Sequence, residues 1–581
     1  MTHLLWYHSS IIYLLHLKRG IDLLRFVLGK SGTGKTEYLY NTLTKLAESG
    51  ENRIIMLIPD QSSFETEKVF LDRLGAKKCQ NVKVFGFSRF CRYVFDTINF
   101  EQKNVIDDST RAVIMSLALE QLDTSLEMFA NSSGKKSVIE AMLSALKECK
   151  KAKISTEMLR NVSALVDDKT LKTKLRETAL IIDTFDAIVE QSYIDPLDNL
   201  TRAAEILKEK NIFDGFTLAV DSFSGFSKQQ LEVLRLLFMQ CESVFVALTL
   251  NPFEDEQQSL FSTTNDTYKS LKAIAKAENI DIKSPIKLEE NFRNESEELK
   301  ILEKNFYQNK NNKYELKTNA ITVFSADTVY GECEFVAKQI KKLIIEQGYL
   351  YSDIAVICRD IAPYAGVLNT VFDKYEIPYF MDMSYDIYIK PVIRYVCSIF
   401  NAVLNGWQKD DLLAILKTGL SNNSDEEISA FENYVYVWNI NGSAFLRPFE
   451  NNPNGYSDKF TQSDFEQLGM AEKVRKSIAH PFKENIKDKT GKEITELLYN
   501  LLCELKVTDA ISNMYDKLKA NGEIAQAKEQ IRLWNLLMGT LDQTVAVAGD
   551  LKISLKRYFE LLSLRLSALQ IADIPRTVDS V

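Results

Sequence analysis

Histidine is scarce in this sequence, with four residues among 581, and three of them fall within the first sixteen positions. Only His480 is left for the body of the chain. Hydrolytic triads use histidine as their base, and most catalytic zinc sites use it as a ligand. Both kinds of site are therefore disfavoured.

Paired cysteines are also lacking. The eight cysteines are scattered singly through the chain, and none forms a Cys-x-x-Cys pair. Small secreted domains stapled by disulfides have a much denser cysteine pattern. The pattern here predicts a cytoplasmic protein in a reducing environment, with buried free thiols.

Positive charge is not in excess. The chain has 71 Lys and Arg against 80 Asp and Glu, a formal net charge of −9 at pH 7. A chain with this balance does not coat nucleic acid as a polycation. DNA binding stays open, because a groove can be basic while the rest of the surface is acidic.

A long apolar run at the start is missing too. Leu4–Leu17 is apolar and aromatic, but it is too short to span a bilayer. Lys18 and Arg19 follow this run, whereas a signal peptide has its basic residues first. We expect no membrane association, and we expect residues 1–22 to be a mis-called translation start or a disordered leader.

The remaining composition is that of an ordinary globular protein, with 45% hydrophobic and 26% charged residues. A chain of 581 residues is long enough for several domains. The sequence therefore predicts a multidomain protein with sizeable apolar cores.

The strongest motif is a phosphate-binding loop. It follows an apolar run, Leu23–Leu28, that predicts a buried strand, and it precedes a helical pattern over Tyr38–Leu46. Its residues are Gly29, Lys30, Ser31, Gly32, Thr33, Gly34, Lys35 and Thr36. A glycine-rich turn without a ligand is the alternative, but every fixed position of the motif is filled.

Each part of this loop has a chemical task. Gly29 and Gly34 let the backbone curl, so that successive N–H groups point at phosphate oxygens. Lys35 can reach the β- and γ-phosphates, and Thr36 can hold Mg²⁺. The N-terminus of the following helix adds partial positive charge. We therefore predict an ATP site with Mg²⁺ as its metal.

Further strands and helices alternate after the loop. Apolar runs at Arg53–Pro59, Val82–Phe85, Phe216–Asp221 and Ser243–Leu250 predict buried strands. Alternating strands and helices favour a parallel sheet, whose ligands lie at the carboxyl ends of the strands. The polar loops that follow the strands are expected at that edge.

Asp221 ends one of these strands and is predicted to orient the metal, together with Thr36. Alone, it could equally be a helix cap. In an efficient motor the next residue would be a glutamate that activates water, but here it is Ser222. Arg293 could reach a γ-phosphate, or it could be a solvated arginine near a helix start. The sequence predicts nucleotide binding more strongly than hydrolysis.

Two long helical stretches interrupt the alternating pattern. The first contains amphipathic segments at Ser109–Leu122, Ser137–Lys150 and Leu171–Ser192. The second half restarts with strands predicted at Ala320–Phe324 and Asp353–Cys358, and is then mostly helical. Both halves thus share one plan, an α/β core interrupted by a helical insertion.

Several motifs together resemble those of the B subunits of AddAB-type ATP-dependent helicase-nucleases. The resemblance runs in order from about Leu24 to the end of the chain. Beside the phosphate-binding loop, it is carried by Pro59-Asp60-Gln61, Phe87-Ser88-Arg89, Val220-Asp221-Ser222-Phe223 and Glu376-Ile377-Pro378-Tyr379-Phe380.

The resemblance implies an α/β fold with two RecA-like lobes of the UvrD helicase type, each carrying a helical insertion, and with the second lobe incomplete. The predicted domains are a leader (1–22), a first nucleotide-binding lobe (23–106 and 211–307), its helical insertion (107–210), a linker (308–319), the start of a second lobe (320–389), a second helical insertion (390–570) and a truncated return to the second lobe (571–581).

The resemblance also implies a function. Such a subunit works with an A subunit, the motor, on double-stranded DNA ends, and it scans the single strand for the regulatory Chi sequence during recombinational repair. Its nuclease domain and iron-sulfur cluster are expected only in a C-terminal part that this chain lacks. The residues that match the family's strand-scanning positions are Gln61, Ser63, Phe87, Arg89 and Phe223.

These side chains suit base readout, because an aromatic ring can stack on a base beside amide, hydroxyl and guanidinium groups. Phe87 could instead be a core residue. Arg92 stands where an aromatic residue is expected, which leaves the recognised DNA sequence open. Two other functions also stay open: an active UvrD-type DNA motor, which Ser222 argues against, and a nucleotide-gated scaffold without catalysis.

Overall fold

We describe the fold from a computed structural model of the chain. The structure describes all residues except 1–22, 101–103, 254–259, 294–295, 307–313, 319, 382–383, 386, 457–458, 480–488, 570 and 573–578. Several predictions fall outside the described residues. They concern the predicted leader, His480, parts of the predicted linker and part of the predicted return to a second lobe.

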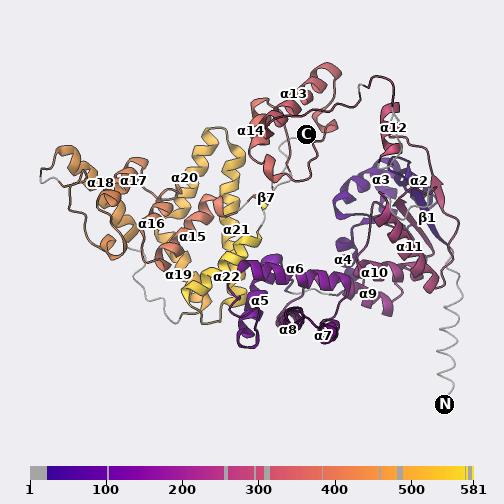
Figure 1. Cartoon of the computed structure of the whole chain (residues 1–581), viewed down its shortest axis with the longest axis horizontal. Helices are drawn as coiled ribbons and strands as arrows, with labels where there is room; N and C mark the ends of the chain where they lie inside the picture. Colours follow the sequence, from indigo (N-terminus) through magenta and orange to yellow (C-terminus); the bar gives the residue numbers. More distant parts are fainter. Residues whose placement is uncertain are drawn as a thin grey trace, which may run out of the picture. The chain divides into compact units, whose positions relative to one another are not determined.

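The chain forms two compact units (Figure 1). Unit 1 comprises Met1–Val105, Ser144–Ala179 and Val189–Phe324, and unit 2 comprises Ile106–Leu143, Leu180–Ile188 and Ser325–Val581. All predicted site residues belong to unit 1.

A six-stranded parallel sheet forms the centre of unit 1, in the order β3-β2-β4-β5-β1-β6. Its strands are β1 (Leu23–Gly29), β2 (Ile54–Leu57), β3 (Val82–Phe85), β4 (Thr217–Val220), β5 (Ser243–Thr249) and β6 (Ile286–Leu288). The predicted parallel sheet is confirmed, and β6 is a strand that the sequence did not predict.

Successive residues of a strand point to opposite faces of the sheet, so the apolar strands present side chains on both faces. Helices cover both faces of this sheet and bury these side chains. Val27 of β1 packs with α2 and α3, whereas Phe26 packs with α4, α9, α10 and α11. The helices of unit 1 are α2 (Lys35–Glu48), α3 (Ser63–Lys78), α4 (Phe87–Thr97), α7 (Thr156–Leu165), α9 (Asn199–Glu209), α10 (Lys228–Gln240), α11 (Ser262–Ala277) and α12 (Glu297–Asn305).

Unit 2 is mostly helical, and a large apolar core joins its later helices. Its helices are α5 (Asp108–Gln121), α13 (Val329–Gln347), α14 (Val367–Lys374), α15 (Pro391–Leu404), α16 (Lys409–Leu416), α17 (Asp425–Val437), α18 (Gln462–Ala479), α19 (Gly491–Glu504), α20 (Val507–Ala520), α21 (Ile524–Ala548) and α22 (Leu555–Ala568). Two short strands, β7 (Ser384–Tyr385) and β8 (Ile571–Ala572), form an antiparallel pair.

Helices α6 (Lys136–Ala152) and α8 (Lys169–Ser192) contribute residues to both units. Short 3₁₀ turns complete the chain: η1 (Asp60–Ser62), η2 (Cys79–Asn81), η3 (Asp123–Ser125), η4 (Pro196–Asp198), η5 (Tyr351–Asp353), η6 (Ala362–Tyr364), η7 (Ile387–Ile389) and η8 (Gly442–Leu446). Helices α5–α9 lie between β3 and β4 in the chain, where an insertion was predicted.

The strands predicted at Ala320–Phe324 and Asp353–Cys358 are wrong for this structure, since neither segment forms a strand among its described residues. A strand in a parallel sheet needs a hydrogen-bonded neighbour and apolar cover on its faces. Val323 is 92% exposed and Ile357 is 90% exposed, so these segments have no such cover. The second lobe and the domain bounds stay predictions.

Candidate nucleotide-binding and DNA-binding sites

The phosphate-binding loop connects β1 to α2, as predicted. Gly34 has φ of 81°, a left-handed conformation that a residue with a Cβ adopts only with strain. The buried Lys35 donates a hydrogen bond from Nζ to the Lys30 carbonyl, at 2.7 Å, and the Thr33 hydroxyl donates to the same oxygen, at 2.9 Å. The loop is therefore closed by its own side chains.

Burial lowers the pKa of the Lys35 ammonium, and Arg293 acts in the same direction while Asp221 opposes it. A buried cation is stabilised by any anion that comes close. The predicted role of Lys35, contact with phosphate oxygens, fits this environment.

Asp221 follows β4 and is only 3% exposed. Its Oδ1 accepts a hydrogen bond from the Ser222 N–H at 2.7 Å, whereas its buried Oδ2 has no hydrogen-bond partner among the described residues. Burial raises the pKa of the Asp221 carboxyl, although Thr36, the Ser222 amide and Lys35 pull in the other direction. A buried carboxylate oxygen without a partner suits a metal ion.

The described residues contain no group of three or more His, Cys, Asp or Glu side chains that could hold a metal ion. Mg²⁺ in nucleotide sites is usually held by one or two protein oxygens, phosphate oxygens and water. Thr36 and Asp221 therefore fit a Mg²⁺ that arrives with the nucleotide.

Arg293 lies beside the phosphate-binding loop, on the same unit. Its Nη1 donates a hydrogen bond to the Ser31 hydroxyl at 3.2 Å, and the neighbouring Phe292 N–H donates to the Gly32 carbonyl at 2.9 Å. Glu303 of α12 forms an ion pair with Lys30 at 3.5 Å, which the sequence did not predict. Residues distant in the chain thus close over the loop.

Ser222 has φ of 65°, so the residue after the metal-side carboxylate is held in a left-handed conformation. At the next position along the chain, Phe223 packs against Phe87 in an edge-to-face arrangement, with the ring centroids 5.5 Å apart. The loop after β4 therefore connects the nucleotide side of the sheet edge to the predicted DNA side.

The loops after β2 and β3 are tied together by Asp60. Its carboxylate accepts a hydrogen bond from the Ser88 hydroxyl at 3.3 Å. A Cβ at Gly86 would overlap the same carboxylate, so only glycine fits there. This contact fixes the loop that carries Gln61 against the start of α4, which carries Arg89.

The predicted DNA-binding residues differ in exposure. Gln61, Arg89 and Arg92 are exposed, and Arg89 forms an ion pair with Glu67 at 2.8 Å. Ser63 is buried, and its hydroxyl donates to the Asp60 carbonyl at 2.9 Å.

The two predicted aromatic contacts are largely packed away in this structure. Phe87 is 6% exposed and belongs to the apolar core under α4. Phe223 is partly buried against the same core. One exposed aromatic ring at this edge is that of Phe64, at 75%, which the sequence did not predict as a contact residue. Exposure of a single aromatic residue leaves no periodic signal in the sequence.

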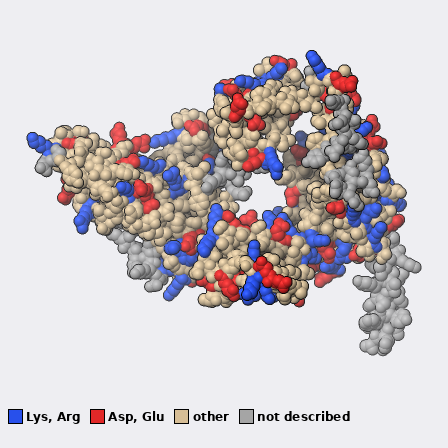
Figure 2. Space-filling view, in the orientation of Figure 1, with Lys and Arg blue, Asp and Glu red and all other residues tan. Residues whose placement is uncertain are grey.

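Charged side chains of both signs are interspersed over the surface in view, with no separation by unit (Figure 2). No helix among the described residues is long and apolar enough to cross a membrane.

Comparison with protein families gives two matches. Residues 26–303 match the family described as "ADDB, N-terminal". Residues 286–554 match the family described as "UvrD-like helicase C-terminal domain". The first range spans the sheet of unit 1 with the phosphate-binding loop, and the second lies mostly in unit 2.

Similar proteins share one name, that of the B subunit of an ATP-dependent helicase/deoxyribonuclease. The protein from Thermoanaerobacter sp. (strain X514) is 30% identical over 570 residues, which are 96% of this chain and 50% of that protein. The protein from Clostridium botulinum (strain Hall) is 31% identical over 574 residues, with the same coverage of 96% and 50%. The chain spans about half the length of these relatives. Together with the complete phosphate-binding loop, these matches show that the chain is similar over nearly its whole length to ATP-dependent helicase/deoxyribonuclease B subunits, and that residues 26–303 match the AddB N-terminal family.

Proposed function

We propose that this chain is an ATP- and DNA-binding, helicase-like part of a heterodimeric helicase-nuclease. In this proposal it processes DNA double-strand breaks for recombinational repair and scans single-stranded DNA for Chi. The observation that carries the nucleotide part is the buried, unpartnered Oδ2 of Asp221, close to Lys35 and Thr36 of the phosphate-binding loop.

Different residues of the site would bind different parts of Mg²⁺-ATP. The backbone N–H groups of the loop and the Lys35 ammonium would bind the phosphates, and Thr36 and Asp221 would hold Mg²⁺. Bound Mg²⁺ neutralises phosphate charge. Arg293 would add a positive charge beside the loop, where its guanidinium contacts the Ser31 hydroxyl.

Hydrolysis is proposed to be weak. Ser222 stands where an efficient motor has a glutamate, and a serine hydroxyl is a poor general base. Nucleotide binding would then act on conformation more than on turnover. An active UvrD-type motor is the competing function, and a nucleotide-gated scaffold without catalysis is a third.

The DNA part of the proposal is supported by the loops after β2 and β3, which present the exposed Gln61 and Arg89 at one sheet edge. An amide can read base edges and a guanidinium can contact phosphate or base. We propose single-stranded DNA as the ligand of this edge, fed from double-stranded ends.

The relatives are named as one subunit of an enzyme, which implies a second, partner subunit. We propose that this partner is an AddA-type motor and that the complex works in the cytoplasm. Nuclease chemistry and any iron-sulfur cluster are proposed to belong to the part of the relatives that this chain does not span.

The test is ATP binding and DNA-dependent ATP hydrolysis by the 581-residue chain. We expect measurable Mg²⁺-dependent ATP binding that Lys35→Ala weakens at least about tenfold, because a charged phosphate contact is lost. Lys45→Ala, at the other end of α2, is the control and should leave binding unchanged.

Hydrolysis should stay slow when single-stranded DNA is added. Rapid DNA-stimulated hydrolysis that Lys35→Ala abolishes would establish the active motor. Failure of the unaltered chain to bind ATP at all would contradict the nucleotide site.

A further inference from the structure

Phe64 is a large apolar side chain that the fold leaves in solvent. It lies in the first turn of α3, directly after Ser63, and is 75% exposed. Phe70, further along the same helix, is instead fully covered by the sheet. Exposure alone assigns no role to this ring, but it leaves the face of the ring free to contact a ligand.

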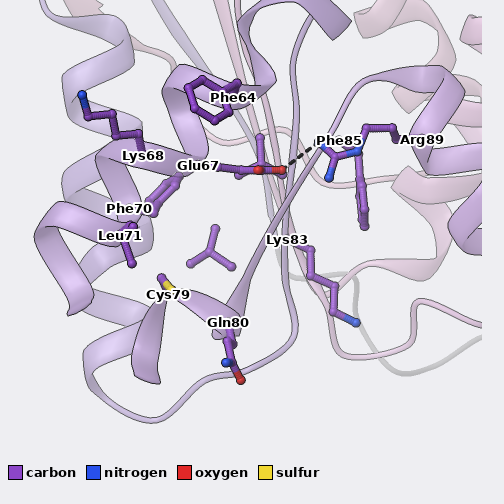
Figure 3. A pocket seen from close by; sticks show the side chains of 12 residues that line it. Phe64, Glu67, Lys68, Phe70, Leu71, Cys79, Gln80, Lys83, Phe85 and Arg89 are labelled. Carbon is purple, nitrogen blue, oxygen red and sulfur yellow. Dashed lines mark hydrogen bonds and ion pairs between the residues drawn. The ribbon is translucent and has the colours of Figure 1, made fainter. Parts of the chain in front are cut away.

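A hollow of about 480 Å³ lies beside this ring, between α3 and β3 (Figure 3). Its wall on α3 carries Phe64 and Leu71, and Val84 of β3 forms part of its floor. Arg89 lines the hollow from the start of α4. The hollow therefore combines an aromatic face with a guanidinium from one of the predicted DNA-binding loops.

The strand that lines the hollow lies at an edge of the sheet. β3 is the terminal strand of the sheet, and among the described residues it pairs with β2 alone. The Phe85 carbonyl accepts a hydrogen bond from Ile58 N–H at 3.0 Å, so Phe85 points its backbone groups toward β2. Backbone groups alternate along a parallel strand, so the N–H and C=O of Val84 point to the open side. Val84 is only 4% exposed, so a ligand would meet this donor and this acceptor only by entering the hollow.

The ion pair between Arg89 and Glu67 stands at the rim, and Figure 3 shows it crossing from α4 to α3. Both side chains are about half exposed, so the pair adds little stability and can exchange partners. A phosphate arriving at the rim can take the guanidinium from Glu67, while Lys68 adds a second positive charge on α3.

We propose that the α3–β3 hollow takes one base of single-stranded DNA, which stacks on Phe64. The base is held with its phosphate on Arg89, and its polar edge faces the backbone of Val84. This inference rests on the proposed DNA-binding function and goes beyond it, because it moves the stacking ring from the packed Phe87 to the exposed Phe64.

An apolar hollow beside an open strand edge can also receive an extended peptide. We favour DNA because Arg89 joins the hollow to the predicted DNA-binding loops, and because the rim carries Arg89 and Lys68 against the single carboxylate of Glu67. A protein ligand becomes one outcome of the test.

The experiment measures binding of the 581-residue chain to oligo(dT) and to an abasic strand of the same length, which keeps the phosphates but has no bases. Phe64→Ala should weaken oligo(dT) binding about 5- to 150-fold, the equivalent of about 1–3 kcal/mol for one stacked base. The same variant should leave binding to the abasic strand unchanged, because no ring is stacked there.

Three further variants separate stacking from bulk and from folding. Phe64→Tyr keeps a flat ring and should retain oligo(dT) binding, whereas Phe64→Leu keeps apolar bulk and should lose it. Phe100→Ala removes an exposed phenylalanine beyond the far end of α4 and should change nothing.

The outcomes are distinguishable. Absence of oligo(dT) binding by the unaltered chain would overturn the proposed DNA function itself. Normal oligo(dT) binding by Phe64→Ala would overturn only this inference, and if that variant also failed to bind its partner protein, the hollow would be assigned to a protein ligand. If Phe64→Ala weakened binding to oligo(dT) and to the abasic strand equally, this inference would also be overturned. The ring would then support contacts to phosphates, which both strands contain.

Discussion

Among single residues, Asp221 carries the most information about the nucleotide site, and its titration gives a direct test. Burial disfavours the carboxylate and raises its pKa. Above that raised pKa the folded chain contains a buried charge without a full set of partners, which lowers stability. Below the ordinary aspartate pKa of about 3.9 the carboxyl group is neutral in both the folded and the unfolded chain. The buried charge then no longer lowers the free energy of unfolding.

Asp221→Asn should therefore raise the free energy of unfolding at pH 7 by about 1 kcal/mol in the absence of nucleotide. The gain should vanish near pH 3, where the native carboxyl is already protonated. The variant should at the same time weaken Mg²⁺-dependent ATP binding at least about tenfold. Urea unfolding at both pH values measures the first effect, with the exposed Asp266→Asn as control. A loss of stability at pH 7 would mean that Asp221 is already paired.

At this scale the sequence predicts the local motif well and the distant contacts poorly. Lys35, Thr36 and Asp221 follow from motif and position at strand ends, and the structure places them together. The sequence left the burial of Phe87 open, because it depends on Phe223 and Phe226, which are far away in the chain. Roles in DNA binding stay predictions.

Among the elements, α10 shows how a side chain fixes the start of a helix. Ser227 accepts a hydrogen bond from the Gln230 N–H at 3.2 Å, and the Gln230 side chain accepts one from the Ser227 N–H at 2.8 Å. This capping box orients a helix whose buried face, including Val233 and Leu237, covers the sheet. A serine followed three residues later by a glutamine is a local signal for a helix start, and it can be read directly from the sequence.

Ser227→Ala should lower the free energy of unfolding by about 1 kcal/mol, because the Gln230 N–H loses its hydrogen-bond acceptor. Ser224→Ala, an exposed serine in the same loop, is the control and should have no effect. Thermal unfolding followed by circular dichroism compares the two. Equal stability of both variants would contradict the capping role.

The elements that sequence reasoning missed depend on neighbours far along the chain. β6 has only three residues and is a strand because β1 lies beside it. The apolar segment that contains Ile357 has the composition of a strand but no hydrogen-bonded neighbour among the described residues. Composition alone does not tell these two cases apart.

For the whole molecule, the question to test is whether the second lobe forms. Ile357 is 90% exposed, whereas Ile340 of α13 is buried in a small core of the same unit. Ile357→Asp should change the free energy of unfolding of the 581-residue chain by less than about 0.5 kcal/mol, because an exposed site tolerates charge. Ile340→Asp should lower it by about 3 kcal/mol or more.

Denaturant titrations measure the free energy of unfolding of the two variants and of the unaltered chain. A loss for Ile357→Asp as large as that for Ile340→Asp would show that its segment packs into a second sheet in solution. A small loss would mean that this lobe needs further residues to form.

The loop after β4 has one more consequence. Asp221 and Phe223 are separated by a single residue, Ser222, which is held in a left-handed conformation, yet the first is the proposed Mg²⁺ ligand and the second packs on Phe87 beside the proposed DNA-binding edge. If a nucleotide moves this loop, the two ligands become thermodynamically linked, and the linkage is reciprocal. Whatever factor ATP imposes on the affinity for DNA, DNA must then impose on the affinity for ATP. If hydrolysis is as slow as proposed, bound ATP would in that way still respond to bound DNA.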